Sequence, residues 1–439
     1  MANTTFFRKV TDKDEQITWS DVFSEFRKPH SKKDLEYALS TGLSFNTATE
    51  ADMLAKWQKP WLFYPILKVG ILLIILCYAV IVVPLLWNMG TVGSILMLQF
   101  IPPLVIPIVL MIFIWELNVP KNISIYELFG IFVVGTLFSF TGTAVMFPIT
   151  NSIFPNISTD VTHIFYYSTA AFREEPGKLL AGVVALLFFQ KKKKIYGITA
   201  LTIGAAVGAG FGAFESVVYA MNQGGIANII ANQILRLVLS LGGHTLYAAP
   251  YVGALGLAMR REQKLTGRCF IDKDFLIAFA LSTAMHFWWN MQDNLGYLKY
   301  SAVTVILWVE LLYILKKCLN EVVVIGSKQS ARVVEKSIVV MAICGTIKGA
   351  VWMSKNGETL LIGRNEGQLQ FPQHTKGVSR RHCSIQLTPQ GWTVRDLNSS
   401  YGTYINGKHK LAPGIDRPLQ NGDVIYLANE EQAFQVMFQ

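Results

Sequence analysis

Long apolar runs separated by short polar segments fill the chain from about residue 61 to residue 319. A helix needs about 20 apolar residues to cross a bilayer, and this rule gives about eight spans. The run Ile226–Leu241 contains Arg236, so it predicts a separate helix that lies in the membrane interface or re-enters it. The expected spans are Phe63–Trp87, Val92–Trp115, Ile125–Phe147, His163–Gln190, Tyr196–Met221, His244–Met259, Phe275–Asn290 and Ser301–Leu315.

The pattern of hydrophobic positions changes after Leu319. Residues 320–336 are polar and predict a linker. Residues 337–439 show short alternating runs between Gly and Asn turns, which is typical of an all-β domain. Residues 1–60 are polar and mixed in charge and predict a small cytosolic segment. The sequence thus predicts a polytopic α-helical membrane domain over 61–319, followed by a cytosolic all-β sandwich.

Composition and charge support the membrane interpretation. Of the 439 residues, 52% are apolar and only 15% are charged, which is too apolar for an ordinary soluble protein. The formal net charge is +10, and because Lys and Arg cluster beside the apolar runs, we expect the lipid bilayer as partner and no nucleic acid. The five cysteines lack C-x-x-C spacing and predict no disulfide framework, and the polar N-terminus predicts no cleavable signal peptide.

The basic loops predict the orientation. Lys191–Lys194, Arg260–Lys264 and Lys316–Lys317 all follow spans that end on the same side when the N-terminus is cytoplasmic. Lys299 is a lone basic residue on the opposite side. We therefore expect an integral membrane protein with both termini in the cytoplasm.

Charged residues inside one span indicate a functional site. The stretch F-R-E-E-P-G-K, Phe172–Lys178, places Glu174, Glu175 and Lys178 within the apolar run His163–Gln190. Burying such charges in hydrocarbon costs several kcal/mol unless they pair or line a wet cavity. A helix-stabilising pair between Glu174 and Lys178 is the structural alternative.

Other polar residues are expected at a similar depth. Span counting places Glu215, His244, His286 and Asn290 in the outer half of the membrane. His286 and Asn290 are four residues apart and share a helix face. There are structural alternatives: Glu215 could pair with Arg236, and the histidines could only pack. Because several spans place polar residues at the same depth, we favour a functional site.

The motifs resemble a known family. E-E-x-x-K at Glu174–Lys178, F-x-x-x-E at Phe211–Glu215, His244 before a Gly-rich span, and H-x-x-x-N at His286–Asn290 are similar to the PrsW intramembrane proteases. These are related to the CAAX prenyl endopeptidases and bacteriocin-processing proteins. The match covers about Phe165–Asn290. It implies hydrolysis of peptide bonds of a membrane-anchored protein, in a bacterial plasma membrane.

The chemistry of the residues fits such a reaction. Glu174 or Glu175 is the candidate base, and a carboxylate shielded by apolar helices suits that task. His286 is the candidate acid or water-orienting group, Asn290 the candidate oxyanion donor, and Lys178 would keep one carboxylate ionised. Two histidines and a glutamate, namely Glu215, His244 and His286, could hold zinc. Since H-E-x-x-H is absent, we favour glutamate chemistry without a metal and leave zinc open.

The C-terminal region carries a second set of motifs. L-I-G-R at Leu361–Arg364, S-R-R-H at Ser379–His382, the run Asp396–Gly407 and N-G-D at Asn421–Asp423 resemble a forkhead-associated (FHA) domain over Ser337–Gln439. The resemblance implies an eleven-strand sandwich whose loops bind phosphothreonine. The implied phosphate contacts are Arg364, Ser379, Arg380 and Ser400, whereas His382 and Asn406 would structure the loops. Tyr401 stands where many members have Asn, which weakens the inference about peptide specificity.

The sequence therefore predicts an intramembrane endopeptidase that cuts near the outer face and is coupled to a phosphothreonine-binding FHA domain. A catalytically silent membrane receptor or scaffold that recruits phosphoproteins is the main alternative. A transporter is a further alternative, since Glu and His within the membrane also relay protons.

Overall fold

The computed structural model describes residues 17–43, 49–50, 52–86, 92–158, 160–335, 337–354, 357–388, 391–407 and 409–438. The predicted span end Trp87, the predicted linker end Lys336 and much of the N-terminal segment lie outside these ranges. The chain divides into a helical unit, Met1–Gly326, and a second unit, Ser327–Gln439.

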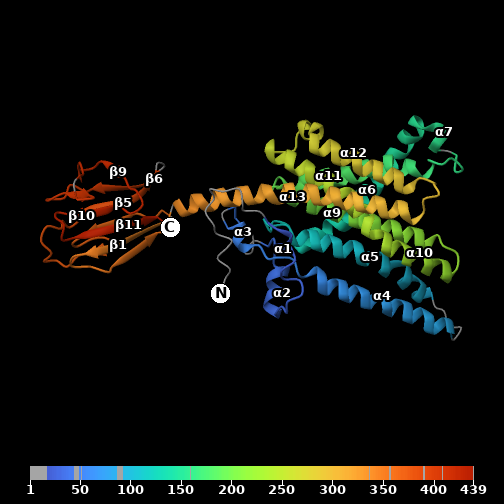
Figure 1. The fold of residues 1–439 in the computed structure, drawn as a ribbon, viewed down its shortest axis with the longest axis horizontal. Coiled ribbons are helices and arrows are strands. Elements are labelled where there is room, and N and C mark those ends of the chain that lie inside the picture. The colour runs from blue at the N-terminus through green and yellow to red at the C-terminus, as the bar shows by residue number, and fades with distance from the viewer. Residues whose placement is uncertain are drawn as a thin grey trace. The chain divides into compact units, whose positions relative to one another are not determined.

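The helical unit consists mainly of long apolar helices joined by short turns (Figure 1). Short helices come first along the chain and between the long ones. The long helices are α4 (Phe63–Leu86), α5 (Val92–Glu116), α6 (Ile125–Ile153), α8 (Ala171–Phe189), α9 (Gly197–Met221), α10 (Ile226–Leu239), α11 (His244–Arg261), α12 (Lys273–Asn290) and α13 (Tyr297–Glu335). The short ones are α1 (Trp19–Val22), α2 (Lys32–Leu39), α3 (Met53–Lys56), α7 (Pro155–Ser158) and the 3₁₀ turns η3 (Tyr167–Ala170), η4 (Ser240–Gly242) and η5 (Gly267–Ile271).

Each predicted apolar run lies in a helix, but several ends differ. The run predicted to start at His163 becomes helical only at Tyr167, in η3. Asp160 and His163 accept hydrogen bonds from the backbone N–H of Thr162 and Phe165, and such local bonds favour turns over helix. At the other end of the unit, α13 continues to Glu335, so the predicted linker is helical over most of its length.

Within the described residues, four helical stretches are long and apolar enough to cross a membrane by themselves. They are Ile95–Glu116, Ile125–Ile153, Gly197–Met221 and Ile226–Arg261. Helix α8 is not among these stretches, because it carries four charged residues, Arg173, Glu174, Glu175 and Lys178. The count of eight spans therefore stays a prediction. As expected, α10 is a helix separate from α11, with η4 between them.

Close backbone contacts fix the helices around the later site. Helix α9 is almost entirely buried and packs along α11. At Gly208 of α9, a Cβ atom would lie 2.2 Å from the carbonyl oxygen of His244. At Gly177 of α8, a Cβ atom would lie 2.6 Å from the carbonyl oxygen of Ser139 in α6. Because only glycine permits such approaches, these positions determine how close α8 and α11 lie to their neighbours.

Glu116, at the end of α5, fixes the start of α4. Its carboxylate accepts the backbone N–H groups of Trp61, Leu62 and Phe63 at 2.8, 2.7 and 2.9 Å. These are the otherwise unsatisfied donors at a helix N-terminus, which a negative charge stabilises. The carbonyl oxygen of Glu116 also accepts from the indole of Trp57, which ties the N-terminal segment to the unit.

The second unit is a sandwich of two sheets, as the sequence predicted. A six-stranded sheet has the order β2-β1-β11-β10-β7-β8, and a five-stranded sheet has the order β4-β3-β5-β6-β9. Alternating residues from both sheets, including Ile338, Trp392 and Phe434, form its own buried core. The strands are β1 (Ile338–Cys344), β2 (Val351–Ser354), β3 (Leu360–Gly363), β4 (Leu369–Gln370), β5 (Cys383–Thr388), β6 (Gly391–Asp396), β7 (Thr403–Ile405), β8 (His409–Lys410), β9 (Asp416–Pro418), β10 (Val424–Leu427) and β11 (Ala433–Phe438).

Candidate active site and phosphopeptide loops

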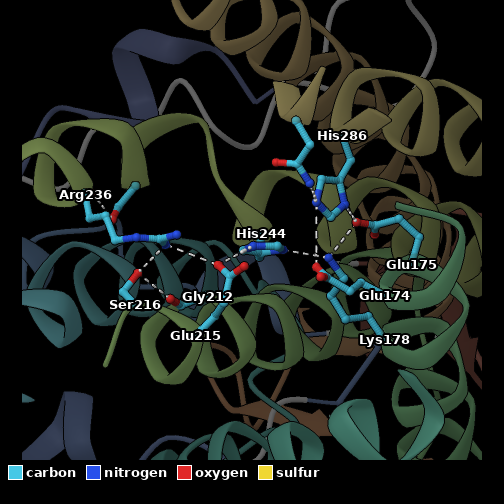
Figure 2. Close-up of polar contacts among 11 residues, drawn as sticks. Glu174, Glu175, Lys178, Gly212, Glu215, Ser216, Arg236, His244 and His286 are labelled. Atoms are coloured by element: carbon cyan, nitrogen blue, oxygen red, sulfur yellow. Dashed lines mark hydrogen bonds and ion pairs between the residues drawn. The ribbon is translucent and has the colours of Figure 1, made fainter. Parts of the chain in front are cut away.

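A cavity of about 1030 Å³ collects the polar residues of the helical unit. Glu174 of α8, Glu215 of α9, His244 of α11, and His286 and Asn290 of α12 all line it. Figure 2 shows His244 in the middle of this group, with Glu215 on one side and Lys178 on the other. The structure thus brings the sequence-predicted residues together.

Glu175 has a partner on each carboxylate oxygen. Its Oε1 accepts from Lys178 Nζ at 2.5 Å and lies 2.6 Å from His286 Nδ1, and its Oε2 accepts from the Tyr251 hydroxyl at 3.2 Å. The side chains of Glu175 and Lys178 are fully buried. An ammonium, an imidazole and a hydroxyl thus surround one buried carboxylate and occupy both of its oxygens. Glu175 is therefore placed to orient His286 and Lys178 and not to meet a substrate.

Glu174 is in a different environment, although it is the preceding residue. Its carboxylate borders the cavity, and Oε2 has no hydrogen-bond partner among the described residues. The imidazole of His286 lies beside it, with Nε2 3.6 Å from Oε2. A buried carboxylate oxygen without a donor normally has a water, an ion or a proton nearby. Glu174 is thus the carboxylate available for chemistry.

His286 has a fixed ring orientation. Its Nδ1 faces Glu175, which as a carboxylate can only accept, so Nδ1 carries a proton. Its Nε2 faces the cavity, 3.1 Å from Asn290 Nδ2 and 3.6 Å from Glu174 Oε2. With a single ring proton, the lone pair of Nε2 and the carboxylate of Glu174 face one another. A cation or a donated proton between them would stabilise that arrangement.

His244 has polar partners on both ring nitrogens. Lys178 Nζ lies 2.7 Å from Nδ1, and since an ammonium only donates, Nδ1 accepts. Nε2 then carries the proton and donates to Glu215 Oε2 at 3.1 Å. Arg236 of α10 donates to the same oxygen at 3.2 Å. Figure 2 shows this continuous chain from Arg236 through Glu215, His244 and Lys178 to Glu175.

One group of side chains among the described residues has the geometry to hold a metal ion. One ligand atom each from Glu174, His244 and His286 lies within 4.8 Å of the others. Two imidazoles and a carboxylate are a common zinc set. The sequence predicted Glu215 as the carboxylate of such a set. In the structure the paired oxygen of Glu215 is occupied by Arg236 and His244, and Glu174 has the free oxygen.

Sequence reasoning missed two tyrosines of α11. The Tyr251 hydroxyl donates to Glu175. The Tyr247 ring stacks on His286 with centroids 4.8 Å apart, and its buried hydroxyl has no partner among the described residues. Tyr247 also lines the cavity. The signal was the spacing, because His244, Tyr247 and Tyr251 follow one another at three and four residues and so share a helix face.

The predicted phosphopeptide residues lie in the loops of the sandwich. The Arg364 backbone N–H donates to the Ser379 carbonyl at 2.9 Å, and the Ser400 N–H donates to Ser379 Oγ at 3.0 Å. These bonds bring Arg364, Ser379 and Ser400 together. The Arg364 guanidinium donates to the carbonyl of Gln373, and Arg380 is exposed.

Two further residues structure these loops, in the way the sequence suggested. His382 accepts from the Ser379 N–H through Nδ1 at 3.0 Å and reaches the Gly402 carbonyl through Nε2 at 3.2 Å. Burial lowers the pKa of His382 below its ordinary value. Asn406 bonds Asp423 and the Val424 N–H. Tyr401, the departure noted in the sequence, is 63% exposed.

Two family models match the chain. Residues 124–315 match the PrsW family intramembrane metalloprotease, and residues 360–428 match the FHA domain. Both resemblances seen in the sequence are confirmed. The PrsW match extends beyond the region Phe165–Asn290 that the sequence motifs covered, and runs from the start of α6 to the middle of α13.

The curated and solved relatives concern the second unit. An FHA domain-containing protein of Arabidopsis thaliana is 31% identical over 21% of this chain and 24% of its own length. FhaA of Mycobacterium tuberculosis is 34% identical over 19% of this chain and 15% of its own length. The chain therefore spans less than a quarter of these relatives.

Two solved FHA domains are also similar to part of this chain. An FHA domain of an Arabidopsis thaliana protein is 29% identical, covers 23% of this chain and 85% of its own, and has a TM-score of 0.21. The FHA domain of FhaA, solved in complex with the intracellular domain of a second protein, is 31% identical, covers 23% of this chain and 98% of its own, and has a TM-score of 0.19.

Proposed function

We propose that this chain, a PrsW family domain joined to an FHA domain, is an intramembrane endopeptidase that cuts a membrane-anchored protein. One observation carries the proposal. Glu174 presents to a polar cavity inside apolar helices a carboxylate oxygen that has no hydrogen-bond partner in the described part of the chain, beside His286 and opposite His244. A receptor that only binds has no need of a desolvated carboxylate facing an imidazole lone pair.

The two glutamates have different roles in this proposal. Glu174 contacts the attacking water. Glu175 is a positioning residue that holds the ring of His286 and the ammonium of Lys178. Carboxylate–histidine pairs of this kind fix the tautomer and direct the other ring nitrogen at the reacting centre. Asn290, within 3.1 Å of His286 Nε2, is the donor to the oxyanion that develops on the scissile carbonyl.

The residues present fit a metal ion, which the family description implies. Glu174, His244 and His286 would hold it, because their ligand atoms converge and Glu174 Oε2 accepts no hydrogen bond from the residues that the structure describes. Bound zinc supplies an activated water near neutral pH and polarises a carbonyl. With a metal bound, His244 would keep only one of its two present partners, Lys178 at Nδ1 or Glu215 at Nε2, and that partner would position the ring.

A second mechanism without metal rests on a specific observation. Both ring nitrogens of His244 already have protein partners, so ligation by His244 would displace Lys178 or Glu215. In that mechanism Glu174 removes a proton from water and passes it to Nε2 of His286, and His286 then delivers this proton to the leaving amine. Inhibition of cleavage by a chelator distinguishes the mechanism with a metal from the mechanism without one.

The second unit supplies recognition of a phosphothreonine protein. Arg364, Ser379 and Ser400 are held together by backbone bonds, and exposed Arg380 adds a cation. Guanidinium and hydroxyl groups are strong phosphate donors. Positive loops on one side of the spans favour a cytoplasmic FHA domain in a plasma membrane protein, with cleavage near the outer face.

Cleavage in proteoliposomes tests the proposed function. Glu174→Gln keeps the shape of the side chain but removes its charge, so cleavage of a membrane-anchored candidate substrate should fall about a hundred- to ten-thousand-fold. The elution volume and melting temperature should stay near wild type, since Glu174 Oε2 makes no hydrogen bond in the described residues.

Two outcomes decide the mechanism. Loss of wild-type cleavage with a chelator and recovery with zinc supports the metal held by Glu174, His244 and His286. Chelator-insensitive cleavage supports direct action of Glu174. Unchanged cleavage by Glu174→Gln would remove Glu174 from the reaction and contradict the proposed site.

A further inference from the structure

Helices α8 and α11 carry a second polar cluster at the ends opposite the catalytic residues. Glu174 lies near the start of α8, and Phe189 ends the helix about 22 Å further along at 1.5 Å per residue. His244 starts α11, and Arg260 lies about 24 Å further along. The second cluster is therefore independent of the catalytic cavity.

A cavity of about 350 Å³ lies in this cluster. Four cationic side chains line it, together with Ile195 and Met259, which are buried. The cations are Lys192, Lys193, Lys194 and Arg260. A hollow with several cations and an apolar floor is suited to a polyvalent anion attached to an apolar group.

The charges lining this cavity are only partly compensated. Lys193 lies 2.6 Å from both carboxylate oxygens of Glu127. Lys194 and Arg260 share a single oxygen of Glu50, at 3.3 and 3.1 Å. In the part of the chain that the structure describes, Lys192 has no carboxylate partner. These four cations form ion pairs with two carboxylates, and a third carboxylate, Glu321, also interacts electrostatically with Arg260, so one positive charge remains in excess.

Apolar side chains beside the cavity indicate what the anion is attached to. Leu187 and Phe188, in the last turn of α8, are 41% and 54% exposed. The Lys192 ammonium lies 4.5 Å from the centroid of the Phe188 ring, so the cation and the exposed apolar surface are adjacent. An acyl chain could run along this surface while its headgroup phosphate reaches the cations. A free phosphate would use only the cations.

We propose that this cavity binds the headgroup phosphate of an anionic phospholipid, with the acyl chains along the end of α8. Lys192 and Arg260 are the phosphate contacts, since Lys192 has no other ionic partner in the described residues and Arg260 shares its carboxylate with Lys194. Arginine and lysine at the ends of apolar helices form such headgroup sites. This inference does not depend on the proposed protease activity.

Lipid retention by the full chain tests the site. The protein is purified in detergent, exposed to vesicles of phosphatidylcholine and phosphatidylglycerol in equal parts, and analysed for retained lipid by native mass spectrometry. The wild type should retain phosphatidylglycerol preferentially. Lys192→Gln with Arg260→Gln should lower that retention roughly 30-fold, as expected for the loss of two cation–phosphate contacts.

A matched control separates a site from general attraction. Lys264→Gln with Lys316→Gln removes the same charge from exposed positions, one after α11 and one within α13, that lie outside the cavity lining. It should leave retention unchanged, and equal loss in both double variants would overturn the site. If the first double variant does not fold, the single change Lys192→Gln takes its place, because Lys192 makes no ion pair in the described residues.

The source of the phosphate is tested separately. Inorganic phosphate should not displace retained phosphatidylglycerol, because it lacks the apolar contact with Leu187 and Phe188. Complete displacement by inorganic phosphate would overturn the lipid assignment, as would equal retention of phosphatidylcholine by the wild type.

Discussion

Glu174 and Glu175 are adjacent in α8 but have different chemical environments. Consecutive residues of an α-helix are turned by about 100°, so one side chain borders the cavity while the other is buried among α11 and α12. In the proposed reaction, the motif would therefore contribute one carboxylate for the chemistry and one for positioning. The environment, and not the residue type, decides which is which.

This difference predicts different consequences for the two isosteric changes. Glu175→Gln would leave Lys178 and His286 without their shared ionised acceptor in a fully buried place. Breaking a buried pair in this way typically costs about 3–5 kcal/mol. We expect a clear fall in melting temperature in detergent together with loss of cleavage. Glu174→Gln is the matched control and should lose cleavage alone. Equal melting temperatures would contradict the positioning role.

At the residue scale, the sequence predicts which residues form the site but not the role of each residue. Glu174, Glu175, His244 and His286 could be identified from charge inside apolar runs. The sequence could not show which of Glu174 and Glu175 borders the cavity, because this depends on how α8 is rotated against α11 and α12. Tyr251 was not found because a tyrosine in an apolar helix is usually a packing residue.

At the scale of helices, close packing of α9 against α11 positions His244. The contact depends on the missing side chain of Gly208, next to the carbonyl of His244. This is a helix–helix contact of the small-residue type that membrane helices favour. The glycine-rich face of α9 therefore helps to position the site residue His244.

Gly208→Ala should move His244 away from Lys178 and Glu215. Its Cβ would meet the His244 carbonyl oxygen at 2.2 Å, and overpacking of this kind costs about 1–3 kcal/mol. Gly130→Ala in α6 is the control, because no atom lies within 4 Å of that Cβ and alanine favours a helix. We expect reduced cleavage and thermal stability only for Gly208→Ala. A Gly208→Ala variant as active as Gly130→Ala would show that His244 tolerates the shift.

Helices were easier to predict than their ends. The long apolar runs in the sequence located the long helices that the structure describes, because helices buried in lipid or protein need apolar side chains along their length. The length of α13 was not foreseen, since the polar residues after Leu319 form helix as readily as linker and no proline stops them. The late start of α8 was missed because side-chain bonds of Asp160 and His163 favour turns.

At the scale of the whole molecule, the two units have separate cores. The sandwich core contains no residue of the helical unit. We therefore expect residues 337–439 to fold alone, which permits recognition and stability to be measured apart from the membrane.

Phosphopeptide binding by this fragment should depend on Arg364. Phosphothreonine peptide libraries are titrated against wild type, Arg364→Ala and Arg417→Ala, the last being a charge control on β9, outside the loop set. We expect at least a roughly tenfold loss for Arg364→Ala alone, since charge-assisted hydrogen bonds contribute about 1.5–3 kcal/mol. Failure of any phosphopeptide to bind better than its unphosphorylated form would end the recognition role.

The stability of the fragment should fall with acid. Burial lowers the pKa of His382 from its ordinary 6.5. Burial alone would raise the pKa of Asp396, but hydrogen bonds from Ser399 and Thr403 outweigh it and hold the pKa below 3.8. Both pKa values are lower when folded, so the unfolded chain binds more protons in acid.

The loss should begin just below the ordinary pKa of histidine. Urea unfolding at about pH 7 and about pH 5 should show lower stability at the lower pH, where His382 takes up a proton and Asp396 does not. His382→Asn, which cannot titrate, should remove that difference, and Asp396 should act only at still lower pH. Equal stability of the wild type at both pH values would contradict a buried neutral His382.

The volume of the catalytic cavity limits how a substrate can enter. An α-helix about 11 Å across with a rise of 1.5 Å occupies roughly 140 Å³ per residue, so 1030 Å³ holds about seven residues. A membrane-spanning helix has about 20. The cavity is thus sized for the stretch around a scissile bond and not for a whole span, and we expect that stretch to enter it unwound or as a chain end. Helix-breaking residues near the scissile bond, and not the length or hydrophobicity of the anchor, should then decide which proteins are cut.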